Sequence, residues 1–499
     1  MHGFQNRGLD VPRGSNPPTG RFGRMFPTLQ PRRPTGLGPA EALGLPGGKM
    51  DGGLTTDAQG NPTMDAGLTF FGQFIDHNIS FDPTTVLGRQ IDPEAVRDFR
   101  PPRLDMDNLY GSGPTVMPYI YDAPSHYTKL TLAPDGVDLA RTADGTALIG
   151  DPRNDENMIL AQLHLAFIKF HNHVVDALRA GTITDVFGNR IPAEPPPPAG
   201  QPAGTGLDGL LALQDYYHDV LAAAQQLVRW HFQWIVLHEV LPAFTGRKII
   251  EDIEQHGLQF FTPAGAPFVP VEFAVAAFRI GHPTVRSDYV VNPSFSAPIF
   301  PVDPDAPADP RSDLRGGPVT AEFAVDWSNF FRTGRHGSPQ RARRMLASLN
   351  IRLLTLPVSA VPGSTPGDLA RPLSSLAVRN LLRGETQELP SGQDVARKIG
   401  EVPLSDTELG TQGPAHLWYY VLREAEVRQH GEHLGPVGAR IVAEVLLGLL
   451  DADPLSYRST YPAWTPTLGG KDGFGVADLL RFAGVLPDHA DAPISAAAS

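Results

Sequence analysis

The chain has 499 residues, of which 41% are hydrophobic, so it can bury a large core. Its net charge of −13 at pH 7 excludes the basic surface that gathers nucleic-acid phosphates, and we expect no nucleic-acid partner. The absence of cysteine excludes disulfides, thiolate metal sites and cysteine nucleophiles. The 51 glycines and 50 prolines predict long irregular connections between regular elements.

The chain divides by composition into an arm, a body and a tail. Residues 1–60 are rich in Gly, Pro and Arg and predict an extended N-terminal arm, whereas residues 486–499 predict a flexible tail. The first residues have no apolar segment, so we expect no signal peptide. No run of 18 apolar residues occurs, so we expect no transmembrane helix. Residues 192–206 and 301–318 are Pro-rich and predict loops.

The strongest periodic segments predict helices, and few segments predict strands convincingly. The expected class is therefore mainly α. The first helix contains the stretch FFGQFIDHNISF (70–81). The second begins at Asp151 as N-cap, has Pro152 at its first position and closes near Gly181. Further helices are expected over residues 210–244, over 271–282, where Pro283 disfavours helical geometry, and over 438–450.

The first helix carries a polar stripe inside an apolar segment. Gln73, Asp76, His77 and Ser80 stand at i, i+3, i+4 and i+7, which places them on one face. A solvated helix face usually contains Lys or Arg, and this stripe contains neither. A buried carboxylate costs several kcal/mol unless it is paired or used chemically. The residues therefore indicate either a chemical site or a core histidine with an Asp partner.

Two further motifs combine charged residues with apolar helices. In GDPRNDEN (150–157), Arg153 and Glu156 stand one turn apart, and could simply form an intrahelical ion pair. In AAFRIGH (276–282), His282 ends an apolar helix beside Gly281. Such a histidine can interact with the helix dipole, or it can bind a metal while the small Gly281 admits a flat group.

The remaining candidates are two short motifs and two histidine pairs. In RNLLRGE (379–385), Asn380 and Arg383 stand one turn apart. In LDMDNLYG (104–111), Asp105 and Asp107 suit calcium, or form a solvated acidic turn. The pairs His164/His171 and His231/His238 would bind zinc only with a third ligand, and core roles are expected for them.

Taken in order, GQFxDH, LDxxxxYG, GDxRxxE, FRxGH and NxxRG resemble the animal-type haem peroxidases, the superfamily that also includes the cyclooxygenases. The resemblance covers roughly residues 70–383 and is to a bacterial-looking member of the peroxidase branch. It implies a large, single-domain, mainly helical fold with long Pro/Gly-rich loops. Residues 61–485 would form the catalytic domain, and the cofactor would be haem b.

The resemblance also implies a role for each motif residue. His77 is similar to the distal acid/base, Gln73 to its neighbour that contacts halide or water, and Arg153 to the distal arginine. The remaining roles concern the haem itself: His282 would be the proximal iron ligand, Asn380 its hydrogen-bond partner, Arg383 the partner of a haem propionate, and Asp76 and Glu156 the carboxylates that form ester links to haem.

The resemblance implies a calcium site as well, although this sequence departs from the usual pattern there. The expected ligands are Asn78, Asp105 and Asp107, with the carbonyls of Pro101 and Arg103. Asn78 stands where the family usually has Asp, and Pro101 where Thr is common. Asn157 replaces the methionine that forms a sulfonium link in myeloperoxidase, which argues against chloride oxidation.

The implied function is reduction of hydrogen peroxide coupled to oxidation of a halide, a pseudohalide or a small organic donor, consistent with a response to oxidative stress. The alternative is a fatty-acid dioxygenase of the cyclooxygenase-like branch, which uses a tyrosine three residues before the proximal histidine. Arg279 occupies that position here, so a radical would need another tyrosine, such as Tyr110 or Tyr289. A zinc hydrolase and a haemless binding protein are further alternatives.

Overall fold

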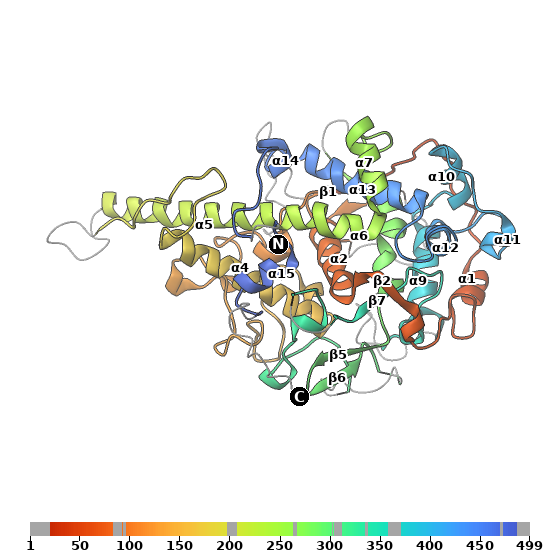
Figure 1. Cartoon of the computed structure of the whole chain (residues 1–499), viewed down its shortest axis with the longest axis horizontal. Coiled ribbons are helices and arrows are strands. Elements are labelled where there is room, and N and C mark those ends of the chain that lie inside the picture. The colour runs from red at the N-terminus through yellow and green to blue at the C-terminus, as the bar shows by residue number, and fades with distance from the viewer. Residues whose placement is uncertain are drawn as a thin grey trace, which may run out of the picture.

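The computed structural model describes residues 20–82, 92, 96–196, 207–262, 267–301, 303, 312–334, 338–357, 371–469 and 473–486. Helices dominate it (Figure 1). The α-helices are α1 (Leu37–Gly44), α2 (Ala66–Ile79), α3 (Asp107–Tyr110), α4 (Met158–Arg179), α5 (Leu207–Ile235), α6 (Leu241–Thr245), α7 (Arg247–His256), α8 (Gly281–Thr284), α9 (Leu376–Thr386), α10 (Gly392–Lys398), α11 (Asp406–Leu409), α12 (Leu417–Gln429), α13 (Pro436–Ala452), α14 (Tyr457–Thr460) and α15 (Val476–Phe482).

The described strands are short and form three small sheets. They are β1 (Gly20–Gly23), β2 (Gly60–Asp65), β3 (Arg97–Asp98), β4 (Val269–Pro270), β5 (Asp288–Asn292), β6 (Phe295–Pro298) and β7 (Arg341–Arg343). β1 pairs antiparallel with β3 and parallel with β4, while β2–β7 and β5–β6 are antiparallel pairs. The predicted class, mainly α with few strands, is confirmed.

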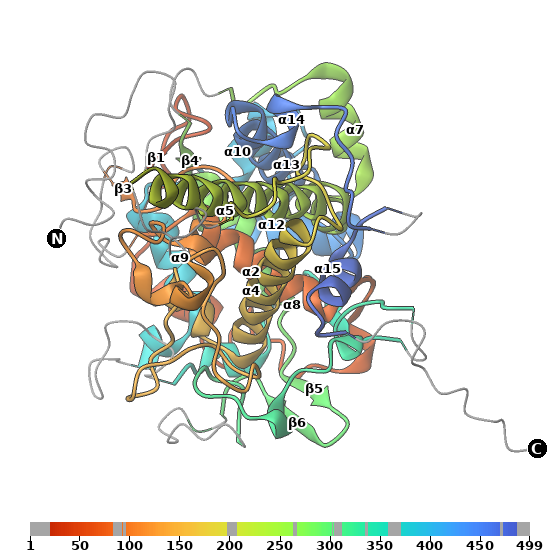
Figure 2. The same ribbon diagram turned by 90° about the vertical axis from the view of Figure 1, so that its left-hand side faces the viewer.

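Helix α2 lies at the centre of the molecule because its aromatic residues need burial on several sides. Phe74 stacks on Phe167 of α4 with ring centroids 4.6 Å apart, and Phe71 stacks on Phe232 of α5 at 5.9 Å. Gly72 allows Phe244 to approach, since a Cβ there would lie 2.8 Å from its ring. Figure 2 shows α2, α4 and α8 together in the interior. This packing turns the polar stripe of α2 toward the candidate site.

The second predicted helix begins later than expected. Asp151 caps a 3₁₀ turn, η6 (Pro152–Asp155), by accepting from the Arg153 N–H. Helix α4 itself starts at Met158, where Asn157 is the N-cap and accepts from the Leu160 N–H. The prediction of one helix from Asp151 was therefore wrong at its start, because a second capping residue interrupts the chain. This break presents Arg153 and Asn154 on a turn.

The helix predicted over 271–282 is broken in the structure. It consists of a π-helical turn, η8 (Glu272–Ala276), a 3₁₀ turn, η9 (Ala277–Ile280), and the new helix α8. Ala276 (φ −128°, ψ −76°) and Arg279 (ψ 20°) depart from helical geometry. Pro283 does not end the helix as predicted, because it occupies the first turn of α8, where its missing N–H is not needed.

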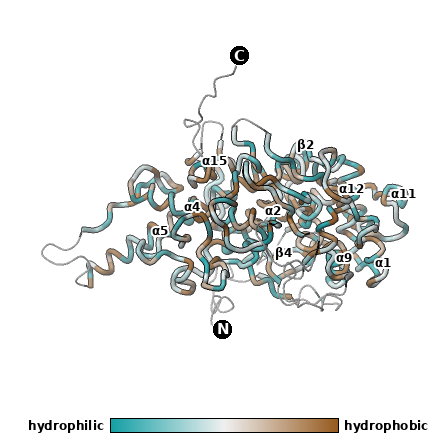
Figure 3. Tube along the Cα trace, turned by 90° about the horizontal axis from the view of Figure 1, so that it is seen from below, coloured by the Kyte–Doolittle hydropathy of each residue, from teal (hydrophilic) through white to brown (hydrophobic). Residues whose placement is uncertain are grey.

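The predicted helix over 210–244 is found as α5 continued through a π-helical turn, η7 (Val236–Val240), into α6. One end of α5 projects beyond the other helices in Figure 1, and hydrophilic and hydrophobic segments alternate along it in Figure 3. The helix predicted over 438–450 is α13. Among the described helices, none is both long and apolar enough to cross a membrane.

The part of the N-terminal arm that is described, residues 20–60, lies against the helical body. Strand β1 pairs with β4 at Phe22 and Val269, and Ser375 Oγ at the start of α9 donates to the Gly44 carbonyl at the end of α1 (2.5 Å). Residues 1–19 and 487–499 lie outside the described residues, as do 197–206 and much of 302–311 within the predicted loops. The arm, body and tail boundaries stay a prediction.

Candidate functional site

Only two side chains of α2, Gln73 and Asp76, keep more than slight accessibility, and both belong to the predicted stripe. Ser80 Oγ donates to Asp76 Oδ1 at 3.0 Å, which pairs the two polar residues at the end of the helix. His77 is buried between them and the turn η6. The helix thus buries every apolar side chain and leaves one polar edge accessible from inside the molecule.

Arg153 is held against α2 by a second charged group, Asp151. Arg153 donates from Nε to Asp151 Oδ1 (3.1 Å) and from Nη2 to Oδ2 (2.9 Å), a two-point contact. Arg100 Nη2 donates to the same Oδ2 at 2.5 Å. Burial alone would raise the pKa of Asp151, but the guanidinium groups of Arg153 and Arg100 lower it well below its usual range. Asp151 is therefore a fixed anion.

The Arg153 guanidinium also fastens the end of α2. Its Nη2 donates to the carbonyl oxygens of His77 (3.2 Å) and Ser80 (2.7 Å), and it lies over the Phe81 ring at 4.5 Å. Its Nη1 has no hydrogen-bond partner among the described residues. The turn η6 and the end of α2 therefore place His77 and Arg153 side by side, with one N–H group of Arg153 left for a ligand.

The His77 imidazole is oriented by an amide. Its Nδ1 lies 2.8 Å from Asn154 Oδ1, while its Nε2 contacts no described hydrogen-bonding group. Burial and, to a lesser extent, the Arg153 guanidinium lower the pKa of His77 to about 4. The imidazole is therefore neutral at pH 7, as a general base must be.

Glu156 faces the inside of the molecule beside Gln73. Gln73 Nε2 donates to Glu156 Oε2 at 3.1 Å, and Asn157 Nδ2 donates to Gln73 Oε1 at 3.1 Å. Glu156 keeps accessible surface, yet burial raises its pKa to about 7 against the lowering effect of Arg153. A carboxyl that is accessible but surrounded by protein lines an internal site rather than the outer surface.

The opposite side of the site is formed by the broken segment η9–α8 and by α9. His282 Nδ1 lies 2.7 Å from Asn380 Nδ2, and Arg279 Nη1 donates to Asn380 Oδ1 at 3.4 Å. An amide nitrogen that donates to Nδ1 leaves the His282 proton on Nε2. An iron ligand needs a bare Nε2, so binding requires the Asn380 amide to turn by 180°. The turn gives up only the long contact with Arg279.

Three arginines gather on this side of the site. Burial lowers the pKa of Arg279, of Arg379 and of Arg383, and each pKa is lowered further by a neighbouring arginine. Arg383 forms an ion pair with Asp82 (3.7 Å), whereas Arg279 forms none with a described residue, and its Nε is buried without a partner. Such a cluster favours binding of an anionic group.

The two sides belong to one site. Thr69 of α2 donates to Thr284 of α8 at 3.0 Å, which joins the helices directly. The carboxylates of Asp76 and Glu156 both raise the pKa of Arg279, so the charges of the two sides act on each other. Gly281, next to His282, would have no atom within 4 Å of an added Cβ, so it borders open space.

These features fit a haem. His282 could bind the iron, Gly281 leaves room for a flat ring, and the cluster Arg279, Arg379 and Arg383 suits carboxylate side groups. Asp76 and Glu156 have carboxylate oxygens on the accessible edge, where ester links are predicted. The structure therefore brings together His77, Arg153, Gln73, Asp76 and Glu156 on one side and His282, Asn380 and Arg383 on the other. Their individual roles stay predictions.

The predicted calcium ligands also lie together, but they satisfy one another. Arg103 Nε donates to Asp105 Oδ2 at 2.8 Å, and the Pro101 carbonyl accepts from the Arg103 N–H at 2.8 Å. The Asn78 side-chain oxygen, with the amide turned to suit its neighbours, accepts from the N–H groups of Met106 (2.9 Å) and Asp107 (3.1 Å). The Asp107 N–H donates to Asp105 Oδ1 at 3.1 Å. A cation would have to displace the Arg103 guanidinium, so the calcium site stays a prediction.

The histidine pairs considered for zinc have other partners. His171 contacts the hydroxyl of Tyr110 at 3.1 Å and the carbonyl of Thr128 at 2.9 Å, and His231 Nδ1 contacts the Leu227 carbonyl at 2.7 Å. Within the described ranges, no group of three or more His, Asp or Glu side chains could hold a metal ion. His164, His171 and His231 are buried in the core, whereas His238 is exposed and stacks on the Trp234 ring with centroids 3.8 Å apart.

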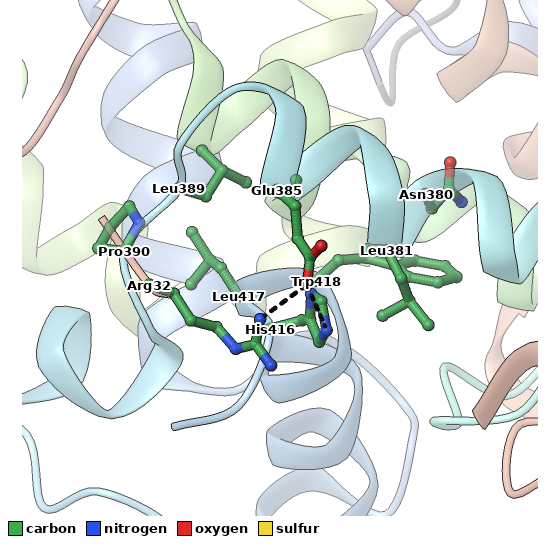
Figure 4. A pocket seen from close by; sticks show the side chains of 10 residues that line it. Arg32, Asn380, Leu381, Glu385, Leu389, Pro390, His416, Leu417 and Trp418 are labelled. Atoms are coloured by element: carbon green, nitrogen blue, oxygen red, sulfur yellow. Dashed lines mark hydrogen bonds and ion pairs between the residues drawn. The ribbon is translucent and has the colours of Figure 1, made fainter. Parts of the chain in front are cut away.

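A small pocket lies beside α9 and shares Asn380 with the candidate site (Figure 4). Its polar lining comes from Arg32, Glu385 and His416, and Trp418 and Asn380 lie at its edge. Arg32 Nη1 donates to Glu385 Oε1 at 3.0 Å, so the pocket is lined by a charge-compensated group. None of His77, Arg153 and His282 lines it.

Sequence reasoning missed the residues that hold the site residues in place. Asp151 was identified only as a helix cap, although it also binds the two arginines. Asn154 stands between His77 and His164, and Trp418 contacts His282 with ring centroids 6.4 Å apart. The sequence signal for Asp151 was its position two residues before Arg153. Asn154 and Trp418 gave no signal, because their contacts come from distant segments.

Comparisons with known proteins show which sequences and folds this chain is similar to. The sequence model of the animal haem peroxidase family matches residues 88–298. No curated protein sequence matches the chain. Among solved structures, peroxidase A from Dictyostelium discoideum is 15% identical, with a TM-score of 0.56 over 91% of this chain and 94% of that one.

Fatty acid alpha-dioxygenases share the fold as well. The enzyme from Arabidopsis thaliana is 13% identical, with a TM-score of 0.50 over 89% of this chain and 72% of that one. The enzyme from Oryza sativa is 13% identical, with a TM-score of 0.50 over 89% and 76%. Residues 88–298 therefore match the animal haem peroxidase family in sequence, and the chain shares the fold of these solved structures over most of its length.

Proposed function

We propose that this chain is a haem peroxidase that reduces hydrogen peroxide and oxidises small donors, either halides and pseudohalides or small organic molecules. The observation that carries the proposal is the pairing of His77 with Arg153. The imidazole has a held Nδ1 and an Nε2 without a described partner, and the guanidinium beside it has Nη1 without one. A base and a fixed cation at one point are what cleavage of peroxide requires.

When bound, haem supplies a redox-active iron that gives electrons to peroxide and recovers them from donors. His77 Nε2 would take the proton from one peroxide oxygen and give it to the other, which leaves as water. For this, His77 must be neutral before the reaction, and its lowered pKa of about 4 ensures this at pH 7.

Arg153 would stabilise negative charge on the leaving oxygen through Nη1. The Asp151 carboxylate holds the guanidinium at two points, so little reorganisation is needed when charge develops. Gln73, fixed between Glu156 and Asn157, would position a water molecule or a halide beside His77. His282, with Asn380 turned, would hold the iron on the opposite side.

The two tyrosines considered for a dioxygenase radical are engaged elsewhere, which favours the peroxidase. Tyr110 bonds to His171 Nδ1 at 3.1 Å, and the Tyr289 hydroxyl accepts from the Arg286 N–H at 2.9 Å. Both are buried, and burial raises the pKa of each far above its usual value. Arg279, three residues before His282, cannot carry a radical.

The test compares two reactions of the purified protein. We expect a Soret band that changes on addition of hydrogen peroxide, followed by oxidation of small phenols or of iodide, bromide or thiocyanate. We expect no oxygen uptake with linoleate or arachidonate. Heat-denatured protein with the same amount of haem is the control for free haem. Rapid oxygen consumption with a lipid and poor turnover of phenols and halides would show a dioxygenase instead.

A further inference from the structure

Asn154 links two buried imidazoles from different elements. It lies in η6, and its side chain is fully buried. Its Oδ1 lies 2.8 Å from His77 Nδ1, and its Nδ2 lies 2.9 Å from His164 Nδ1. His164 comes from α4 and is also fully buried, beside the Phe74 ring at 6.0 Å. One amide therefore contacts the same ring atom, Nδ1, of both histidines.

The amide sets opposite proton positions on the two rings. An amide oxygen only accepts hydrogen bonds, and an amide nitrogen only donates them. His77 must therefore carry its proton on Nδ1, and His164 must carry its proton on Nε2. Both rings have a single proton at neutral pH, because burial lowers the pKa of His77 to about 4 and of His164 to about 3. His77 Nε2 is then bare and able to accept a proton.

Turning the amide would reverse this result. With Asn154 Nδ2 toward His77, that ring would accept at Nδ1 and carry its proton on Nε2, where it could not act as a base. His164 Nε2 is buried without a described partner, so the contact with Asn154 is the one described hydrogen bond of its ring. The hydrogen bonds that run from His77 through Asn154 end at His164, among apolar groups. They therefore fix the position of a proton and do not conduct protons.

We propose that Asn154, anchored by His164, is a positioning residue that fixes His77 in the tautomer with a bare Nε2. The consequence for peroxide rests on the function proposed above, whereas the tautomers themselves do not. Asn154 and His164 are not expected to touch peroxide or the donor.

The direct test is nitrogen NMR of the full chain labelled with ¹⁵N-histidine, with zinc protoporphyrin in place of any iron porphyrin so that the sample is diamagnetic. Two-bond couplings show which ring nitrogen carries the proton. We expect the proton on Nδ1 in His77 and on Nε2 in His164. Assignment uses His77→Gln and His164→Gln. A proton on Nε2 of His77 in the wild-type chain would overturn the proposal.

Variants of Asn154 separate positioning from packing. Asn154→Leu keeps the size but removes the bridge, so His77 should show both tautomers, and its reaction with peroxide should slow about 10- to 100-fold. Asn154→Asp accepts from both Nδ1 atoms, so it should keep the His77 tautomer, move the His164 proton to Nδ1 and restore most of the rate. A single unchanged His77 tautomer in Asn154→Leu would contradict the proposal.

A matched pair of histidine variants tests the anchor even if the Asn154 variants fold poorly. His164 and His231 are both fully buried among aromatic rings, with an Nε2 that has no described partner. His164→Phe should mix the His77 tautomers and slow the peroxide reaction, while the donor KM stays unchanged. His231→Phe should do neither. Equal effects of the two substitutions would mean that His164 acts only through packing.

The outcomes also distinguish this inference from the proposed function. The expected tautomers in a chain that does not react with peroxide would support the bridge and refute the peroxidase. Peroxidase activity in a chain whose His77 carries its proton on Nε2 would support the peroxidase and refute the bridge.

Discussion

The two sides of the site differ in how completely their charges are compensated. On the side of α2 and η6, the Asp151 carboxylate binds both Arg153 and Arg100, and His77 is neutral. On the side of α8 and α9, neighbouring arginines lower one another's pKa, and a buried Arg279 Nε has no partner. On the first side both arginines are paired with a carboxylate, whereas the positive charge of the second side suits a bound anion.

The two sides also differ in how regular their helices are. Helix α2 is continuous and buries its apolar side chains, while η8, η9 and α8 change helix type twice within a few residues. π-helical turns often occur at functional sites. We infer that the side of α2 is preorganised and that the side of His282 depends on its ligand.

The largest expected effect separates the two sides by haem content. His282→Ala should lose most haem on purification, because it removes the predicted iron ligand. His77→Ala should keep haem but react with peroxide about 10²- to 10⁴-fold more slowly, the usual contribution of a general acid or base. Absorbance at the Soret band and stopped-flow mixing with peroxide measure the two quantities.

The control for these variants is His231→Ala, which removes a buried histidine outside the site. It should keep both haem and peroxide reactivity. If His77→Ala reacted with peroxide at the wild-type rate, the assignment of the distal base would be wrong.

The next effect tests the rigid cation on the side of α2. Arg153→Lys keeps the charge but cannot reproduce the two-point contact with Asp151 at 3.1 and 2.9 Å. We expect the rate with peroxide to fall about 10²- to 10³-fold, as when one preorganised donor is lost. Haem content should stay at the wild-type level.

Arg286→Lys is a matched control, since Arg286 lies outside the site and donates to backbone carbonyls of Asp288 and Arg341. It should leave the peroxide rate unchanged. A similar loss of rate in both variants would mean that the effect arises from general destabilisation.

These contrasts show where sequence reasoning succeeds. Gln73, Asp76 and His77 lie on one helix, so a single periodicity placed them on one face, and α2 presents them together. The mainly helical fold followed from similar local patterns. Arg153 and Glu156 were predicted in the first turn of a long helix but lie on and after a 3₁₀ turn, where the Glu156 charge still raises the pKa of Arg153.

Other features depend on contacts that no local pattern contains. Asn154 gains its partners from α2 and α4, which approach only after Phe74 and Phe167 stack. The break at Ala276 and Arg279 has no Gly or Pro at those positions, so the sequence predicted a continuous helix. In the sequence, Arg279 was considered only because it occupies the position of the tyrosine that dioxygenases use, three residues before the proximal histidine. That no described carboxylate forms an ion pair with it is visible only in three dimensions.

A smaller effect tests whether haem becomes covalently attached on the side of α2. Asp76 and Glu156 both keep accessible surface at the positions of the predicted ester links. After cycling with peroxide, part of the haem should resist acid–organic extraction. Asp76→Asn and Glu156→Gln should each remove one link and increase the extracted fraction. Asp82→Asn, whose carboxylate pairs with Arg383, is the control. Complete extraction from the cycled wild-type protein would exclude covalent attachment.

The pH dependence of the peroxide reaction tests the environment of His77. A base reacts in its neutral form, and burial lowers the His77 pKa to about 4. The rate constant should therefore be nearly flat from pH 7 to about 5 and fall about tenfold per unit well below pH 4. A histidine with the ordinary pKa of about 6.5 would already lose about nine-tenths of its rate at pH 5.5. Circular dichroism at each pH controls for unfolding, and a loss beginning near pH 6.5 in folded protein would contradict the burial of His77.

The smallest expected effect concerns calcium, because the predicted ligands already have protein partners. The Arg103 guanidinium binds Asp105, so a calcium ion must displace it before the Asp105 carboxylate becomes a ligand. We expect metal analysis after dialysis to find calcium, with weak binding and a rise in Tm of a few degrees when calcium is added to chelator-treated protein. Arg103→Gln keeps the backbone carbonyl but removes the competing cation, so it should bind calcium more tightly than wild type. Asp107→Asn should bind less. If calcium raised the Tm of neither the wild-type chain nor Arg103→Gln, these residues would form only an acidic turn beside α2.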